Sequence, residues 1–327
     1  MHAWCAYNRK QSMLITNIPK ALSRGAKLMP HVKAEEIIVE KGRAVGVRGV
    51  RYENGRAAER IAVTADRVVV SAGSVQSAVL FLKSGITPET VGRTLHIHPA
   101  APVGAYFSDP VEAWHGTPQT YLSHQFATFY ETGYGGFLLM AQSGHPGITG
   151  TMVPGMGEEF AGRMRRYPYL AAGSGMVHDE TNGLVELKSD GDFKISYWPD
   201  DHDARAIVEG AKRCAEAYLA AGATEVFLPT PRAVSVKSAS DLPLFDAIDF
   251  APFNISIAAV HPQSTIPMGE DRRRCAVDSY GQSHAVRGLY AADMSVFPTS
   301  VGVPPQITTG TLAVRTADYL FEDMRSA

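Results

Sequence analysis

Two stretches near the C-terminus carry the most information: Ala258-Ala-Val-His261-Pro262-Gln-Ser-Thr265-Ile-Pro-Met268-Gly269 and Leu289-Tyr-Ala-Ala-Asp293-Met-Ser-Val-Phe297-Pro298-Thr299-Ser-Val-Gly302-Val-Pro304-Pro305-Gln306-Ile-Thr308. In them an imidazole, His261, stands on a loop, and a short apolar strand ends in an acid, Asp293. A loop rich in glycine and proline then leads into a helix, whose first N–H groups have no partners within the helix. Because helix N-termini attract anions and open α/β sheets bind nucleotides at the carboxyl ends of their strands, the pattern predicts a nucleotide site.

A second strand, turn and helix lie upstream. Residues 67–70 indicate a buried strand, Ser71-Ala-Gly73-Ser74 a turn, and residues 75–84 a helix with Ser74 as its N-cap. Further elements are predicted from alternation and helical spacing: strands at 44–52, 57–63, 184–188 and 193–197, and helices at 12–24, 203–221 and 307–323.

These stretches resemble the signatures of the glucose–methanol–choline (GMC) oxidoreductases, which are FAD-dependent alcohol oxidases and dehydrogenases. The two C-terminal stretches are similar to the segments that in this family place a histidine over the flavin and close the cofactor site. Residues 68–86 resemble the family's second signature, and Val91-Gly92-Arg93-Thr-Leu95-His-Ile-His98-Pro99 resembles a third. The matches follow the family's order over nearly the whole chain. Residues 10–19 and 114–119 are most similar to the branch that includes long-chain alcohol oxidases.

The resemblance implies a mixed α+β fold. Residues 1–102 and 253–327 would form the rear part of an FAD-binding domain, and residues 103–252 an inserted substrate-binding domain with an antiparallel sheet. The family's opening strand, Gly-x-Gly-x-x-Gly turn and helix are not found, because the glycine clusters at 133–136 and 155–157 lack the spacing or the context. We therefore expect the chain to be the C-terminal part of such an enzyme, truncated at its N-terminus.

His261 is the strongest candidate for a catalytic residue. Removing a hydride from an alcohol carbon requires the hydroxyl group to lose its proton, and a neutral imidazole is the usual acceptor. An isolated histidine is more often structural, but the Pro262, Thr265 and Met268-Gly269 around this one favour catalysis. By resemblance, a second catalytic residue, Asn or His, is expected eleven positions after Asp293. Pro304 occupies that position and has no side-chain donor, so the resemblance leaves the substrate oxygen without its second partner.

By resemblance, Asp293 and Met294 would lie against the pyrophosphate and ribitol of FAD. The carboxylate would accept from a ribitol hydroxyl group or fix the loop, and a plain loop acid is the alternative. Pro305 and Gln306 open the last helix, whose N–H groups would stabilise negative charge on the reduced flavin. Proline is also common in the first turn of any helix.

Three further positions are predicted to contact the cofactor. Ala72 and Gly73 would allow the backbone to approach a dinucleotide closely, although ordinary packing of a strand on a helix explains them equally well. Ala34 falls where the family often carries a valine over the adenine.

The function implied is oxidation of an alcohol (a CH–OH donor) to an aldehyde or ketone by hydride transfer to FAD. The inserted segment is rich in apolar residues. If they line a pocket, they favour a bulky apolar alcohol as substrate; if they form the core of the sheet, they give no information on the substrate. These residues are Phe126, Phe129, Tyr130, Tyr134, Phe137, Leu138, Leu139 and Met140. A sterol-type alcohol oxidase and a catalytically silent remnant remain alternatives. The electron acceptor is left open.

Composition limits the remaining classes. The 327 residues are 45% hydrophobic and 20% charged with a formal net charge of −2, which argues against a nucleic-acid binder. No run of eighteen apolar residues and no apolar leader is present, so we expect no transmembrane segment and a cytoplasmic location. The three cysteines are far apart and odd in number, and they indicate neither a disulfide framework nor a metal site.

Overall fold

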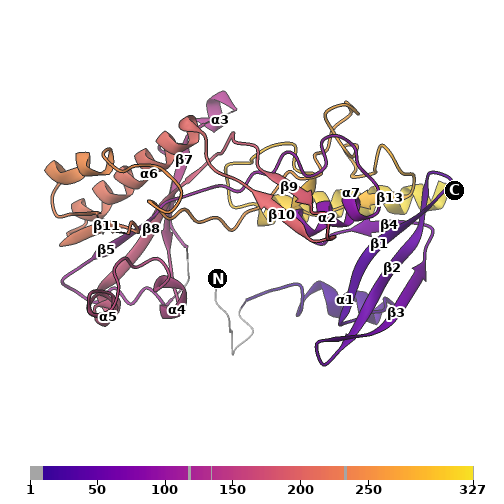
Figure 1. Ribbon diagram of the computed structural model, residues 1–327, viewed down its shortest axis with the longest axis horizontal. Coiled ribbons are helices and arrows are strands. Elements are labelled where there is room, and N and C mark those ends of the chain that lie inside the picture. Colours follow the sequence, from indigo (N-terminus) through magenta and orange to yellow (C-terminus); the bar gives the residue numbers. More distant parts are fainter. Residues whose placement is uncertain (1–9, 117–118, 134, 232–233, 327) are drawn as a thin grey trace.

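The computed structural model describes residues 10–116, 119–133, 135–231 and 234–326, which form two lobes side by side (Figure 1). One lobe contains both the start and the end of the described chain, and the other is formed by its middle. The expected mixed α+β fold is confirmed. Within the described residues, no helix has the length and apolarity needed to cross a membrane.

The first lobe combines an antiparallel meander with a parallel strand pair. In the parallel pair, Val68 lies opposite Leu289 and Val70 opposite Ala291, so both strands end at the same edge. This places the two predicted strand–turn–helix units next to each other. The elements of this lobe are α1 (Asn17–Ser23), β1 (Val32–Glu40), β2 (Arg43–Glu53), β3 (Arg56–Thr64), β4 (Val68–Val70), α2 (Ser74–Lys83), β13 (Leu289–Ala291), η3 (Met294–Val296) and α7 (Gln306–Ser326).

The second lobe is a six-stranded antiparallel sheet in the order β12-β11-β5-β8-β7-β6. Helix α6 covers one face of it, because its buried stripe of Ile207, Ala211 and Ala215 packs on the sheet. Asp200 caps α6 by accepting from the Asp203 backbone N–H. The elements are β5 (Pro102–Tyr106), β6 (Leu122–Ser123), α3 (Phe129–Thr132), β7 (Phe137–Gln142), α4 (Pro146–Thr149), α5 (Glu158–Arg165), β8 (Leu170–Val177), α6 (Asp201–Ala220), β11 (Glu225–Leu228) and β12 (Val234–Val236).

The predicted hairpin of 184–197 is found as β9 (Leu184–Leu187) and β10 (Phe193–Ser196). It packs on the first lobe rather than on the six-stranded sheet, because Val185 and Phe193 join the hydrophobic core around α2. The division of the chain at 103 and 252 stays a prediction.

Two local predictions need correction. Ser74 is not the N-cap of α2 but its first residue, and Gly73 holds the N-cap position without any side-chain cap. The Ser74 hydroxyl makes no cap hydrogen bond and instead donates to the carbonyl of Pro262, 2.6 Å away. The helix predicted over 12–24 is shorter, because α1 begins only at Asn17.

Candidate active site

The sequence signatures meet at one place, around an extended segment that follows His261. This segment runs beside η3, where the Ser264 N–H donates to the Met294 carbonyl at 2.9 Å. It is also attached to the start of α2, because the Thr265 hydroxyl donates to the Ser74 carbonyl at 2.6 Å. Segments nearly 200 residues apart in the sequence are therefore held together by hydrogen bonds.

Two histidine rings form the centre of the site. The Nδ1 atoms of His98 and His261 lie 3.2 Å apart, and the rings meet edge to face with centroids 5.3 Å apart. His98 is 2% exposed, whereas His261 is half-buried. Burial lowers the pKa of His261 below its ordinary value, so the ring is neutral at physiological pH.

The other ring nitrogen of His98 faces two donors. Its Nε2 accepts from the backbone N–H of Gly302 at 2.9 Å and from the side-chain amide of Gln263 at 3.0 Å. The Gln263 amide is oriented by its oxygen, which accepts from the Val301 N–H at 3.2 Å. Burial lowers the pKa of His98 to about 3, so the ring is neutral and its single proton is on Nδ1.

A buried carboxylate holds this region from behind. Asp179 is fully buried and accepts from the backbone N–H groups of Ile97 and His98, at 2.9 and 3.1 Å. It also accepts from the hydroxyl groups of Tyr197 and Ser300, each at 2.9 Å. His98 has a φ of 54°, an unfavourable conformation for a non-glycine residue, which these bonds maintain.

The charge of Asp179 persists despite its burial. Burial by itself would raise the pKa of this carboxyl group, but the nearby His96 and the hydrogen bond from Ile97 outweigh it and lower the pKa to about 2. Asp179 has no sequence signal of its own and was not predicted. His98 had one, the His-Pro pair of the third signature, but its contact with His261 was not anticipated.

Asp293 fastens the two predicted cofactor loops to each other. One carboxylate oxygen accepts from the Gly73 N–H at 2.8 Å and from the Ser77 hydroxyl at 2.5 Å. The other accepts from the Ser295 N–H at 2.8 Å. Of the roles expected for Asp293, fixing the loop is the one for which these contacts give direct support. Met294 follows it, half-buried, in η3.

The edge beside these loops is open at the end of β4. Ala72 and Gly73 are exposed at the end of β4, and a Cβ added to Gly73 would meet no atom within 4 Å. Helix α2 begins there without a side-chain cap, so its N-terminus can face an anion. Pro305 is buried and Gln306 is exposed at the start of α7. Ala34 lies apart from them, exposed on β1 in a different sheet.

Pro304 is exposed on the loop between the histidine pair and α7. It lies two residues after Gly302, whose N–H contacts His98.

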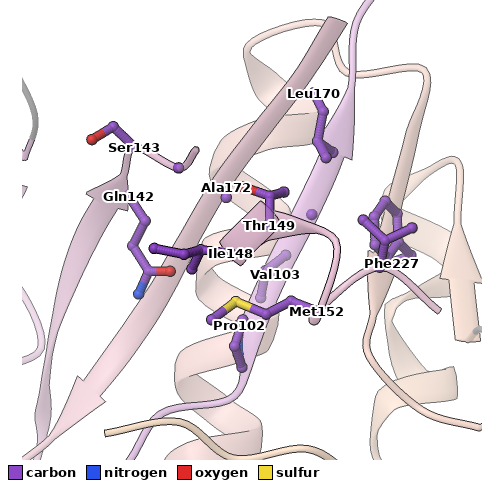
Figure 2. Close-up of a pocket in the computed structure, with 13 residues that line it drawn as sticks. Pro102, Val103, Gln142, Ser143, Ile148, Thr149, Met152, Leu170, Ala172 and Phe227 are labelled. Atoms are coloured by element: carbon purple, nitrogen blue, oxygen red, sulfur yellow. The ribbon is translucent and has the colours of Figure 1, made fainter. Parts of the chain in front are cut away.

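The apolar residues of the inserted segment mostly lie in the core. Leu138 is fully buried, and Phe129 and Phe137 are 8% and 5% exposed, whereas Tyr130 is exposed; Tyr134 lies outside the described residues. A separate cavity of about 60 Å³ lies on the sheet face opposite α6, next to α4 (Figure 2). Its lining includes Ile148, Met152 and Phe227 rather than the predicted residues.

The site thus brings together paired parallel strand ends, an exposed backbone edge and two adjacent imidazoles. The chain belongs to the GMC oxidoreductase family, because family models described as GMC oxidoreductase match residues 1–100 and 179–313. It is similar to an uncharacterised GMC-type oxidoreductase of Mycobacterium tuberculosis, with 31% identity over 96% of this chain and 48% of that protein. It is also similar to a long-chain-alcohol oxidase of Arabidopsis thaliana, with 25% identity over 88% of this chain and 41% of that protein.

Solved structures share the fold. A formate oxidase variant from Aspergillus oryzae superimposes with a TM-score of 0.70 at 16% identity, covering 96% of this chain and 63% of that chain. An FAD-dependent oxidoreductase from Chaetomium thermophilum gives 0.63 at 15% identity, covering 94% and 64%. The chain spans about half the length of the curated relatives it matches.

Proposed function

We propose that the protein oxidises an alcohol, a CH–OH donor, to an aldehyde or ketone with FAD, and that His261 is the base. The observation that carries the proposal is the half-buried neutral imidazole of His261. The segment that carries it is hydrogen-bonded to the start of α2 and to η3, beside the ends of β4 and β13. When bound, FAD supplies a hydride acceptor. The chain supplies the proton acceptor and the scaffold that positions it.

His261 suits the role of base for an electrostatic reason. Its pKa is lowered by burial, so one ring nitrogen is unprotonated at neutral pH. A general base of this kind contributes roughly a hundredfold to ten-thousandfold to the rate. Ala72, Gly73, Asp293, Met294, Pro305 and Gln306 are the residues that would hold the cofactor, with Ala34 as a more distant candidate.

A bulky apolar alcohol is the proposed substrate class. Phe129, Leu138 and Met176 form a small apolar cluster, and Val303 packs against it next to Pro304. A Cβ on Gly302 would lie 2.6 Å from the Phe129 ring, so this cluster comes directly up to the loop beside the histidine pair. The cluster itself is buried core, so the substrate class rests on the similarity to long-chain-alcohol oxidases of Arabidopsis thaliana.

The test is anaerobic reduction of the protein loaded with excess FAD by straight-chain primary alcohols of increasing length. We expect loss of flavin absorbance that becomes faster with chain length. His261→Gln should slow it at least a hundredfold, whereas the control His124→Ala, which changes an exposed histidine, should not. Reduction at the parent rate in His261→Gln contradicts the assignment of the base. No reduction by any alcohol favours a catalytically silent protein.

A further inference from the structure

We propose that His98 is the second hydrogen-bonding residue on the substrate oxygen, donating from Nδ1 while His261 Nδ1 accepts the hydroxyl proton. The inference rests on the proposed function. It assigns to His98 the donor that Pro304 cannot supply, and it specifies which nitrogen of His261 is the base.

The direction of the histidine–histidine contact follows from the surroundings of His98. A backbone N–H can only donate, so the Gly302 N–H, 2.9 Å away, requires a lone pair on His98 Nε2. The Gln263 amide group, oriented by the Val301 N–H, requires the same. The proton of the neutral ring is therefore on Nδ1. Across the 3.2 Å contact, His98 donates and His261 Nδ1 accepts.

This arrangement presents a donor and an acceptor to the same point. An alcohol oxygen placed between the two Nδ1 atoms would donate its proton to His261 and accept from His98. Two hydrogen bonds of ordinary length to one oxygen require the nitrogen atoms to separate by roughly 1.5 Å more than they do now. His98 is fixed by Gly302, Gln263 and the bonds of its backbone to Asp179, so the half-buried His261 ring is the one that swings.

The chemistry balances without a further reactant. The hydroxyl proton would go to His261 Nδ1 as the C–O bond becomes a carbonyl, and FAD, when bound, would supply the acceptor for the hydride of the carbinol carbon. As the O–H bond breaks, negative charge grows on the oxygen. The Nδ1–H of His98, buried and already oriented, stabilises that charge in the transition state.

The first test needs neither FAD nor substrate. The chain is labelled with ¹⁵N-histidine, and the ring nitrogens are assigned by comparison with His98→Asn and His261→Gln. We expect His98 to carry its proton on Nδ1 and to stay neutral down to about pH 4. We expect the spectrum of His261 to show a proton on Nε2 and none on Nδ1. A proton on Nε2 of His98 overturns the proposal.

The second test compares two substitutions in the FAD-loaded protein. His98→Asn keeps an N–H group near the position of Nδ1, whereas His98→Leu removes it. We expect flavin reduction to fall on the order of a hundredfold in His98→Leu and much less in His98→Asn. The rate in His98→Leu should also depend more steeply on the acidity of the alcohol, because an alkoxide that is stable by itself needs the donor less.

The outcomes separate the two proposals. Equal losses in both variants, with no change in the dependence on alcohol acidity, would mean that His98 only supports the fold, and His261 would remain the base. Failure of every alcohol to reduce FAD in the parent protein would remove the proposed function and this inference with it. Parent-like reduction in His98→Leu would overturn this inference alone.

Discussion

Asp293 accepts a hydrogen bond of 2.8 Å from the backbone N–H of Gly73, although 220 residues separate them in the sequence. The same carboxylate accepts from Ser77 and Ser295, so one side chain joins the ends of β4 and β13. It is 8% exposed, and two of its partners, Ser77 and Ser295, are fully buried, so their groups would lose this acceptor if it were removed.

Removing this carboxylate should therefore destabilise the first lobe. We expect Asp293→Ala to lower the free energy of unfolding by about 3 kcal/mol, because buried donors lose their acceptor. Urea denaturation followed by circular dichroism measures it. The control Glu36→Ala removes an exposed ion pair with Arg48 and should change stability by less than about 1 kcal/mol. Equal losses of stability in the two variants would contradict the role of Asp293 in joining the two strand ends.

Gly73 should matter more for the cofactor than for stability. Gly73→Ala places a methyl group in open space but at φ 81°, so we expect a loss of about 1 kcal/mol of stability and weaker FAD binding. Gly25→Ala is matched to it, with φ 93° and no neighbour within 4 Å. Fluorescence titration with FAD should show weaker binding in Gly73→Ala than in Gly25→Ala. Equal affinities in the two variants would contradict the assignment of Gly73 to the cofactor site.

The chain on its own should hold FAD weakly. Its sequence has no Gly-x-Gly-x-x-Gly turn to hold the pyrophosphate. Residues 71–73 at the end of β4 are exposed whereas Asp293 at the end of β13 is buried, so the two strand ends offer only part of a cradle. We expect the visible spectrum of the desalted protein to show far less than one flavin per chain. A stoichiometric flavin peak after desalting would show that the cradle is formed by other residues.

The stability of the protein should depend on His98 between pH 7 and pH 5. Burial lowers the pKa of His98 in the folded protein to about 3 from an ordinary 6.5. Below pH 6.5 only the unfolded chain binds the proton, so acidification favours unfolding. His98 accounts for a loss of about 2 kcal/mol over this range. Urea denaturation at pH 7 and pH 5 measures the stability lost on acidification. This loss should be smaller by about 2 kcal/mol in His98→Asn than in the parent protein, and an equal loss in both would contradict the prediction.

Pro304→Asn tests the division of labour between the loop and His98. If His98 already supplies the donor, the single substitution should change turnover little. In His98→Leu the new amide should restore part of the lost rate, because a single donor to a developing oxyanion is worth roughly 2.7–4 kcal/mol. A double-mutant cycle measures this coupling, and strictly additive effects would show that position 304 and His98 act independently.

Local pattern was enough to anticipate much of the scaffold. Gly73 and Gly85 bracket a helix because few residues tolerate their positive φ, and Ile207 and Ala211 reveal the buried face of α6 by their spacing. The assignment of Ser74 as a cap is wrong because its hydroxyl makes no cap hydrogen bond and instead contacts the carbonyl of Pro262, 188 residues away. Sequence spacing contains no information on such a partner.

The same reason explains why the centre of the site was only half predicted. His261 stands in a signature, but its partner His98 is held by three segments far from it in sequence, those carrying Asp179, Gln263 and Gly302. Their hydrogen bonds exist only after the lobes have assembled. A histidine held by a glycine N–H looks, in sequence, like any other histidine before a proline.

The parallel pairing of β4 with β13 also has a consequence for how the protein reaches its native state. Nothing can pair residues 68–70 with 289–291 until the intervening chain has closed a loop of more than 200 residues, which costs entropy that no local contact returns. We therefore expect the edge formed by β4 and β13 to assemble late in folding. A chain that stops before that closure would contain folded hairpins and helices but no assembled site.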